Sequence, residues 1–230
     1  MMSGILLAVG GFISSIATTV GPVIASAATA LATKLPMTAI GIKLAMDTIS
    51  TVSTVISKTA EMLGIAPAEE NHEELGAKAM QEDIKPREEF ESTQEYLDYL
   101  RKDVELDKEK YTKMSEEEKI SCRVLGTTMV SKSIEEKAGV EISPDFLITI
   151  YKAKLGCEQV EKFINVFADH GITSMDEMAK YITNELPEER VPEIGEIIET
   201  SVKELSPSLS NDEIMQEVVN MKRAYNESEL

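Results

Sequence analysis

The chain has 230 residues, no tryptophan, 12 methionines and a formal net charge of −18. Such a negative chain repels nucleic-acid phosphates, so we expect no nucleic-acid partner. The charge is unevenly placed: up to Gly64 three lysines outnumber two acids, for a sum of +1, and the remainder therefore carries −19.

Residues 1 to 33 contain no charged side chain and are rich in Gly, Ala, Ser and Thr. If they are helical, Ala17, Gly21 and Ala25 share one face, and Gly11 and Ser15 share a neighbouring one. Small residues four apart allow a second helix to approach closely, as in packed membrane helices. The run is also long enough to cross a bilayer, which takes about 20 apolar residues. Its polar residues and Pro22 weaken insertion as a lone helix, so a multi-chain bundle is favoured.

Three interpretations of this run stay open. A helix that is apolar all round is typical of the buried centre of a globular domain or oligomer, and equally of a membrane segment. A signal peptide is the least favoured, because no Lys or Arg precedes the apolar run. We therefore expect synthesis in the cytoplasm, followed by membrane association or incorporation into a particle.

A second helix is predicted from the residues after Pro36 to about Gly64. Its apolar and small residues alternate in steps of four and three, a heptad pattern that predicts a seam facing a partner helix. The seam consists of Ile42, Met46, Ile49, Ser53, Ile56, Ala60 and Leu63. Residues 1–65 are thus predicted to form an apolar, small-residue helical hairpin that turns near Pro36.

The composition changes after residue 65. Residues 66–91 are predicted to be a charged linker with a short helix from His72 to Glu82, and residues 92–230 an acidic α-helical domain. Helix starts in this domain are marked by Ser92 with Glu95, Ser115 with Glu118, Ser143 with Pro144, and Ser174 with Glu177. Gly139 and Gly171 mark helix ends. No stretch alternates at period two, so the predicted class is all-α.

No catalytic or metal-binding pattern emerges, and we expect neither enzymatic activity nor a cofactor. His72 and His170 lack the spacing of a metal motif. Cys122 and Cys157 lie in helical patterns and are interpreted as reduced, buried thiols, although the sequence leaves a disulfide between them open. Adjacent acids such as Glu69 and Glu70 are interpreted as solvated charge near helix starts.

Two functional hypotheses follow. The first is a membrane-engaging or delivered protein, of the effector or ejected-virion type, whose N-terminal hairpin inserts or oligomerises. The alternative is a structural subunit or adaptor of a phage-like tail, secretion apparatus or filament, with the hairpins packed in its interior. The expected partners are copies of the chain itself, a lipid bilayer or other particle subunits. On the continuous-helix interpretation, Gly21→Leu should disrupt close packing and Gly21→Ala should be mild.

Overall fold

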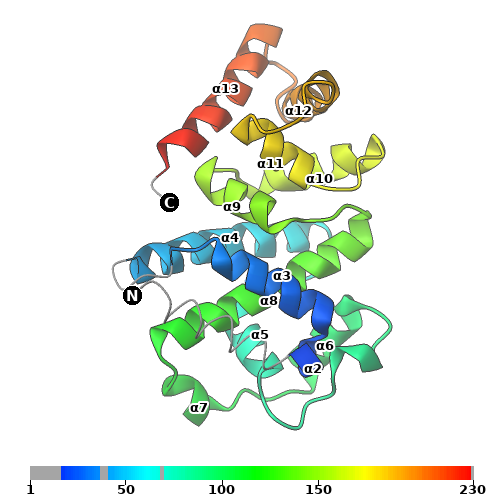
Figure 1. Ribbon diagram of the computed structural model, residues 1–230. Coiled ribbons are helices and arrows are strands. Elements are labelled where there is room, and N and C mark those ends of the chain that lie inside the picture. Colours follow the sequence, from blue (N-terminus) through cyan, green and yellow to red (C-terminus); the bar gives the residue numbers. More distant parts are fainter. Residues whose placement is uncertain (1–16, 37–40, 68–69, 229–230) are drawn as a thin grey trace. The chain divides into compact units, whose positions relative to one another are not determined.

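The computed structural model (Figure 1) describes residues 17–36, 41–67 and 70–228. These residues form helices joined by loops, with one isolated bridge between Glu141 and Ser174. The predicted all-α class is therefore confirmed for the described residues. Contacts divide the chain into two compact units, Met1–Glu136 and Lys137–Leu230. The predicted domain boundaries after residues 65 and 91 rest on composition and stay predictions.

Unit 1 contains helices whose starts follow from local sequence. Asn71 accepts hydrogen bonds from the backbone N–H groups of Glu73 and Glu74, and Ser92 accepts one from Glu95. Ser115 and Glu118 form the predicted reciprocal capping box, at 3.2 Å and 2.7 Å. The elements are α2 (Ala17–Val20), α3 (Pro22–Thr33), α4 (Ile42–Met62), α5 (His72–Ala79), the 3-10 helix η1 (Arg87–Glu89), α6 (Thr93–Lys102), α7 (Lys108–Thr112) and α8 (Glu116–Ala138), which runs just past the division.

The predicted first helix is interrupted at Gly21. This residue has φ +81° and ψ 150°, a conformation that is essentially restricted to glycine, and Pro22 then opens α3. The expectation that one continuous helix places Ala17, Gly21 and Ala25 on a common face is therefore wrong. Sequence spacing suggested a face, but the Gly-Pro pair ends α2 and starts a new helix.

The second predicted helix is present as α4. Along its seam, Ile49, Ser53, Ile56 and Ala60 are buried, while Ile42, Met46 and Leu63 near its ends are half-buried. Thr48, Val52, Ser57 and Thr59 are buried as well, so the covered surface is wider than the heptad pattern predicted.

Unit 2 comprises α9 (Pro144–Lys152), α10 (Cys157–Asp169), α11 (Asp176–Thr183), α12 (Val191–Leu205) and α13 (Asn211–Glu227). The Ser143 hydroxyl accepts from the Phe146 N–H at 3.1 Å, as predicted, and Gly139 and Gly171 follow helix ends with φ +72°. The predicted capping box of Ser174 with Glu177 is wrong. Met175 holds the capping position, and the Glu177 carboxylate instead pairs with Arg190 at 2.5 Å.

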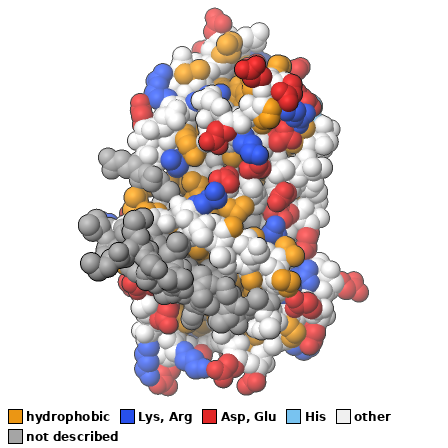
Figure 2. Space-filling view, in the orientation of Figure 1, with side chains coloured by type: hydrophobic (Ala, Val, Ile, Leu, Met, Phe, Trp, Pro, Cys, Tyr) orange, Lys and Arg blue, Asp and Glu red, His pale blue; other side chains and the backbone are white. Residues whose placement is uncertain are grey.

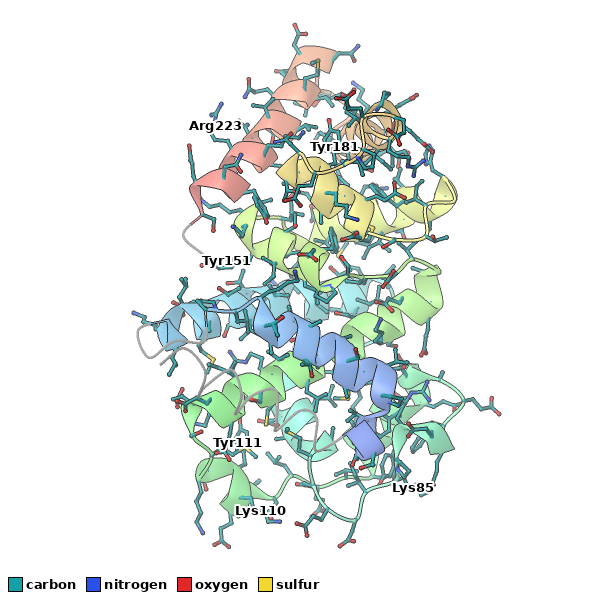
Figure 3. All side chains as sticks on the ribbon, viewed as in Figure 1. Lys85, Lys110, Tyr111, Tyr151, Tyr181 and Arg223 are labelled. Atoms are coloured by element: carbon teal, nitrogen blue, oxygen red, sulfur yellow. The ribbon has the colours of Figure 1, made fainter. Side chains whose placement is uncertain are left out.

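The surface of unit 2 keeps lysines close to aromatic rings. The Lys222 ammonium lies 3.9 Å from the centroid of the Tyr181 ring, which is labelled in Figure 3. On the face shown in Figure 2, acidic and basic side chains are interspersed rather than separated into two patches. Acidic and basic side chains that lie close together reduce the repulsion expected from the net charge.

Candidate functional site

Helices α5 and α8 of unit 1 approach each other closely enough for their backbones to touch. A Cβ atom on Gly76 would lie 1.8 Å from the carbonyl oxygen of Cys122, and one on Gly126 would lie 1.9 Å from that of His72. Each helix therefore needs glycine at the point where a carbonyl of the other helix reaches its backbone. Because the two backbones are in contact, α5 is held in a fixed register on α8.

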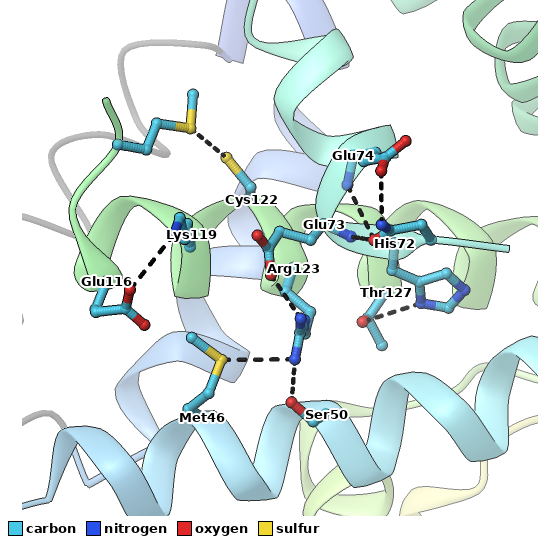
Figure 4. Close-up of polar contacts among 12 residues, drawn as sticks. Met46, Ser50, His72, Glu73, Glu74, Glu116, Lys119, Cys122, Arg123 and Thr127 are labelled. Atoms are coloured by element: carbon cyan, nitrogen blue, oxygen red, sulfur yellow. Dashed lines mark hydrogen bonds and ion pairs between the residues drawn. The ribbon is translucent and has the colours of Figure 1, made fainter. Parts of the chain in front are cut away.

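A charged network joins four helices beside this crossing, and Figure 4 shows its residues from α4, α5 and α8. The Glu73 carboxylate on α5 pairs with Arg123 of α8 at 2.5 Å and accepts a hydrogen bond from the Tyr111 hydroxyl of α7 at 2.7 Å. Arg123 also donates to the hydroxyl of Ser50 on α4, and its Nη1 lies 3.5 Å from the Met46 sulfur. The pair is largely enclosed, with 8% of the Glu73 side chain and 24% of the Arg123 side chain exposed. Burial together with the hydrogen bond to Glu73 raises the pKa of Tyr111.

His72 lies inside the same crossing and is only 1% exposed. Its Nδ1 lies 3.1 Å from the Thr127 hydroxyl, while its Nε2 has no hydrogen-bond partner among the described residues. Burial, with smaller contributions from the nearby Arg101 and Arg123, lowers the pKa of His72 to about 3. The imidazole is therefore neutral at physiological pH.

A pocket of about 370 Å³ opens where α2 meets α3. Its apolar wall includes Pro22 and Val23, and its polar wall comes from η1, α6 and α8. There the Glu136 carboxylate accepts from the backbone N–H of Thr93 at 2.8 Å and pairs with Arg87 at 3.3 Å. A Cβ atom on Gly21 would lie 3.0 Å from the Glu88 carboxylate. Glycine is thus required at position 21 for two reasons: its backbone angles, and the nearby Glu88 carboxylate that leaves little room for a side chain.

The residues that the sequence predicted to pack against a partner helix lie in three helices, α2, α3 and α4, or outside the described residues. Gly11 and Ser15 lie outside the described residues, and Ala17 is in α2. Gly21 is buried at the junction of α2 with α3, and Ala25 is buried on α3. The α4 residues among them are Ile42, Met46, Ile49, Ile56 and Leu63, of which Ile49 and Ile56 are fully buried.

The residues at the α5–α8 crossing were missed by sequence reasoning. The one available signal was Arg123, the only charge between Ile120 and Met129 in an otherwise uncharged stretch. A lone cation on the inward side of a helix calls for a buried acidic partner. Nothing in the sequence indicated which acid that would be.

Neither a metal-binding group of His, Cys and acidic residues nor a bilayer-crossing helix is found in the described parts of the chain. No three His, Cys, Asp or Glu side chains gather there in a way that could hold a metal ion. Among the same residues, no helix has both the length and the apolar character needed to cross a bilayer. No family model, curated protein or solved structure matches this chain.

Proposed function

We propose that this chain is a non-enzymatic membrane-engaging or delivered protein, of the effector or ejected-virion type, whose N-terminal helical hairpin inserts into a bilayer or oligomerises. The observation that carries the proposal is the uncharged run of residues 1–33, joined to a remainder that is strongly acidic. An apolar segment can enter lipid while the acidic body stays in water, since charges are costly in the membrane interior.

The two sides of α3 support this division of roles. One side faces the interior of unit 1 and carries the buried residues Ile24, Ala25, Ala28, Leu31 and Ala32. The other side carries no charge and leaves Val23 66% exposed, next to exposed Pro22. Apolar surface at this end of α3 is therefore accessible before any rearrangement, and release of α3 would add the five buried aliphatic residues to it.

The break in the helix at Gly21 limits how the segment could cross a membrane. With 12 residues, α3 is about 18 Å long, shorter than the roughly 30 Å of a bilayer core. A crossing therefore needs α2 and earlier uncharged residues to continue the same helix. In the proposal, Gly21 returns to helical angles when the segment leaves unit 1, which joins α2 to α3.

Replacing Val23 with lysine tests the proposal, because the side chain is exposed in the fold. Lysine there should leave thermal unfolding almost unchanged, yet a charge costs about 2.5–3.5 kcal/mol at the centre of a membrane helix. We expect full-length wild type to float with phosphatidylcholine vesicles and Val23→Lys to stay in the dense fractions. Val219→Lys on α13, where the valine is 47% exposed, is the matched control and should float like wild type. Wild type that stays in the dense fractions would refute membrane engagement, and Val23→Lys that floats like wild type would refute insertion of this segment.

The second candidate, a structural subunit or adaptor of a phage-like tail, secretion apparatus or filament, is supported by the small side chains on the outward side of α3. Ser26 and Thr33 are exposed, and Ala27, Thr29 and Ala30 are half-buried. Such a surface admits a neighbouring helix at short range. Mass photometry without lipid separates the candidates: assembly of wild type that Val23→Lys abolishes favours the subunit, and a monomer that floats with vesicles favours membrane engagement.

A further inference from the structure

Three sulfur atoms from separate segments of unit 1 meet beside the α5–α8 crossing. The Cys122 sulfur on α8 lies 3.5 Å from the sulfur of Met80 and 3.8 Å from that of Met114. Cys122 is fully buried, and both methionines are half-buried. Figure 4 shows Cys122 with a dashed contact to a methionine sulfur.

The fold determines where each sulfur lies. Gly76 packs on the carbonyl of Cys122, and Met80 comes one helical turn later at the end of α5, so the crossing directs it to the thiol. Met114 immediately precedes the capping box of Ser115 with Glu118, which fixes the start of α8. The three side chains therefore converge because backbone contacts place them, in addition to any attraction between the sulfurs.

The spacing matches a metal site. With a metal–sulfur bond of about 2.3 Å, three sulfurs around one ion in a plane lie about 4 Å apart. The Cys122–Met80 and Cys122–Met114 sulfur separations of 3.5 Å and 3.8 Å are a few tenths of an ångström shorter, as expected for sulfurs that touch one another. One thiolate and two thioethers form a soft ligand set, which selects Cu(I). Zinc is disfavoured because its protein sites use thiolate, imidazole or carboxylate and almost always four ligands.

A route to the sulfurs also exists. A pocket of about 370 Å³ is lined by Met80 and Met114 together with Tyr111 and Glu118. An ion can therefore reach the thioethers from solvent and then the thiol behind them. The pocket lining holds three acids, Glu82, Asp107 and Glu118, against two lysines, Lys110 and Lys113, so its balance of charge favours a cation.

We propose that Cys122, Met80 and Met114 bind one Cu(I) ion in a three-sulfur site. On binding, the S–H bond of Cys122 breaks, a Cu–S bond forms, and the proton leaves to solvent, with no change in oxidation state. The ion and the thiolate then neutralise each other, which suits a buried position. Silver(I), which has the same charge and softness, should occupy the same ligands.

The test is an anaerobic titration of the full-length protein with Cu(I) in competition with the chromophoric chelator bicinchoninate. Wild type should bind one equivalent, Cys122→Ser should not bind, and Met80→Leu and Met114→Leu should each bind at least about tenfold more weakly. Leucine is close to methionine in volume, so both variants should fold. Cys157→Ser and Met215→Leu, which alter the other cysteine and a methionine that is 57% exposed, are matched controls and should bind like wild type.

X-ray absorption at the copper edge supplies an independent readout, in which three sulfur neighbours are expected. Loss of binding in Cys157→Ser would overturn the proposal. So would Met80→Leu and Met114→Leu proteins that bind like wild type, or a site with fewer than three sulfur ligands. If Cys122→Ser fails to fold, the two leucine variants still decide the outcome.

Discussion

Unit 1 uses small residues at two places, for different physical reasons. At the start of α3, Gly21 is needed for its backbone angles, and it ends one helix before the next begins. At the α5–α8 crossing, Gly76 and Gly126 have no side chain because a carbonyl of the other helix occupies that space. The sequence drew attention to the first place, where small residues recur without charge. A contact between helix backbones occurs at the second, between helices that carry charged residues.

The comparison teaches that small residues four apart do not by themselves identify a helix contact. Ala17, Gly21 and Ala25 have the spacing, but Gly21 interrupts the helix, so Ala17 and Ala25 lie in different helices. Gly76 and Gly126 sit in different helices, 50 positions apart, so no spacing rule within one helix connects them. Four predictions, from the largest expected effect to the smallest, test this contrast.

The largest effect is expected at the crossing. Gly76→Ala or Gly126→Ala places a methyl group less than 2 Å from a backbone oxygen, so α5 must move away from α8. We expect a loss of at least about 3 kcal/mol in the free energy of unfolding, at the upper end of overpacking costs. Urea unfolding followed by circular dichroism measures it. Gly156→Ala, whose Cβ would meet only the Gln159 side chain at 3.8 Å, is the control and should change stability little. Wild-type stability in both crossing variants would contradict the close contact.

The next effect concerns the ion pair beside the crossing. Arg123→Met leaves the enclosed Glu73 carboxylate without its cation, and we expect a loss of about 2–4 kcal/mol. Adding Glu73→Gln to that variant should recover part of the loss, because the unpaired charge is gone. A double-mutant cycle by urea unfolding measures the coupling. Additive losses in the double variant would show that the two side chains act independently.

A third effect is a pH dependence arising from His72. Its pKa of about 3 in the folded protein lies below the ordinary value of 6.5, so the unfolded chain binds more protons between those values. Its contribution is complete above pH 6.5 and is lost as the pH falls toward 3. From pH 7 to pH 5 the loss should be about 2 kcal/mol. His72→Asn, which keeps a polar atom near the Thr127 hydroxyl, should flatten this part of the stability profile. His170→Asn is the matched control, and an equal flattening of its stability profile would show that the pH dependence does not arise from His72.

The smallest effect is expected at Gly21. Gly21→Ala forces a side chain into a conformation that is essentially restricted to glycine, and we expect a loss of about 1 kcal/mol in the free energy of unfolding, at the lower end of the cost of such a conformation. This corrects the mild effect expected from a continuous helix. Under the proposed function the same variant should float with vesicles more readily than wild type, because alanine favours the joined helix by about 1 kcal/mol. Reduced flotation would show that membrane binding does not require α2 and α3 to join at Gly21.

Local chemistry in the sequence determined much of the helical framework. The Ser115–Glu118 box, the Ser143 cap before Pro144, and Gly139 and Gly171 at helix ends were all predictable, since each is satisfied by residues within a few positions. The α4 seam was predictable for a similar reason, because periodic burial leaves a periodic pattern. The Ser174–Glu177 prediction failed where a more distant residue, Arg190, competed for the carboxylate.

Tertiary structure alone decided the rest. The Glu73–Arg123 pair, the enclosure of His72 and the meeting of Cys122 with Met80 join residues about 40 to 55 positions apart. Many acids in this chain were equally eligible partners for Arg123 by sequence. The choice depends on how α5 crosses α8, and that crossing is set by two glycines whose role appears only when the opposing carbonyls are in place.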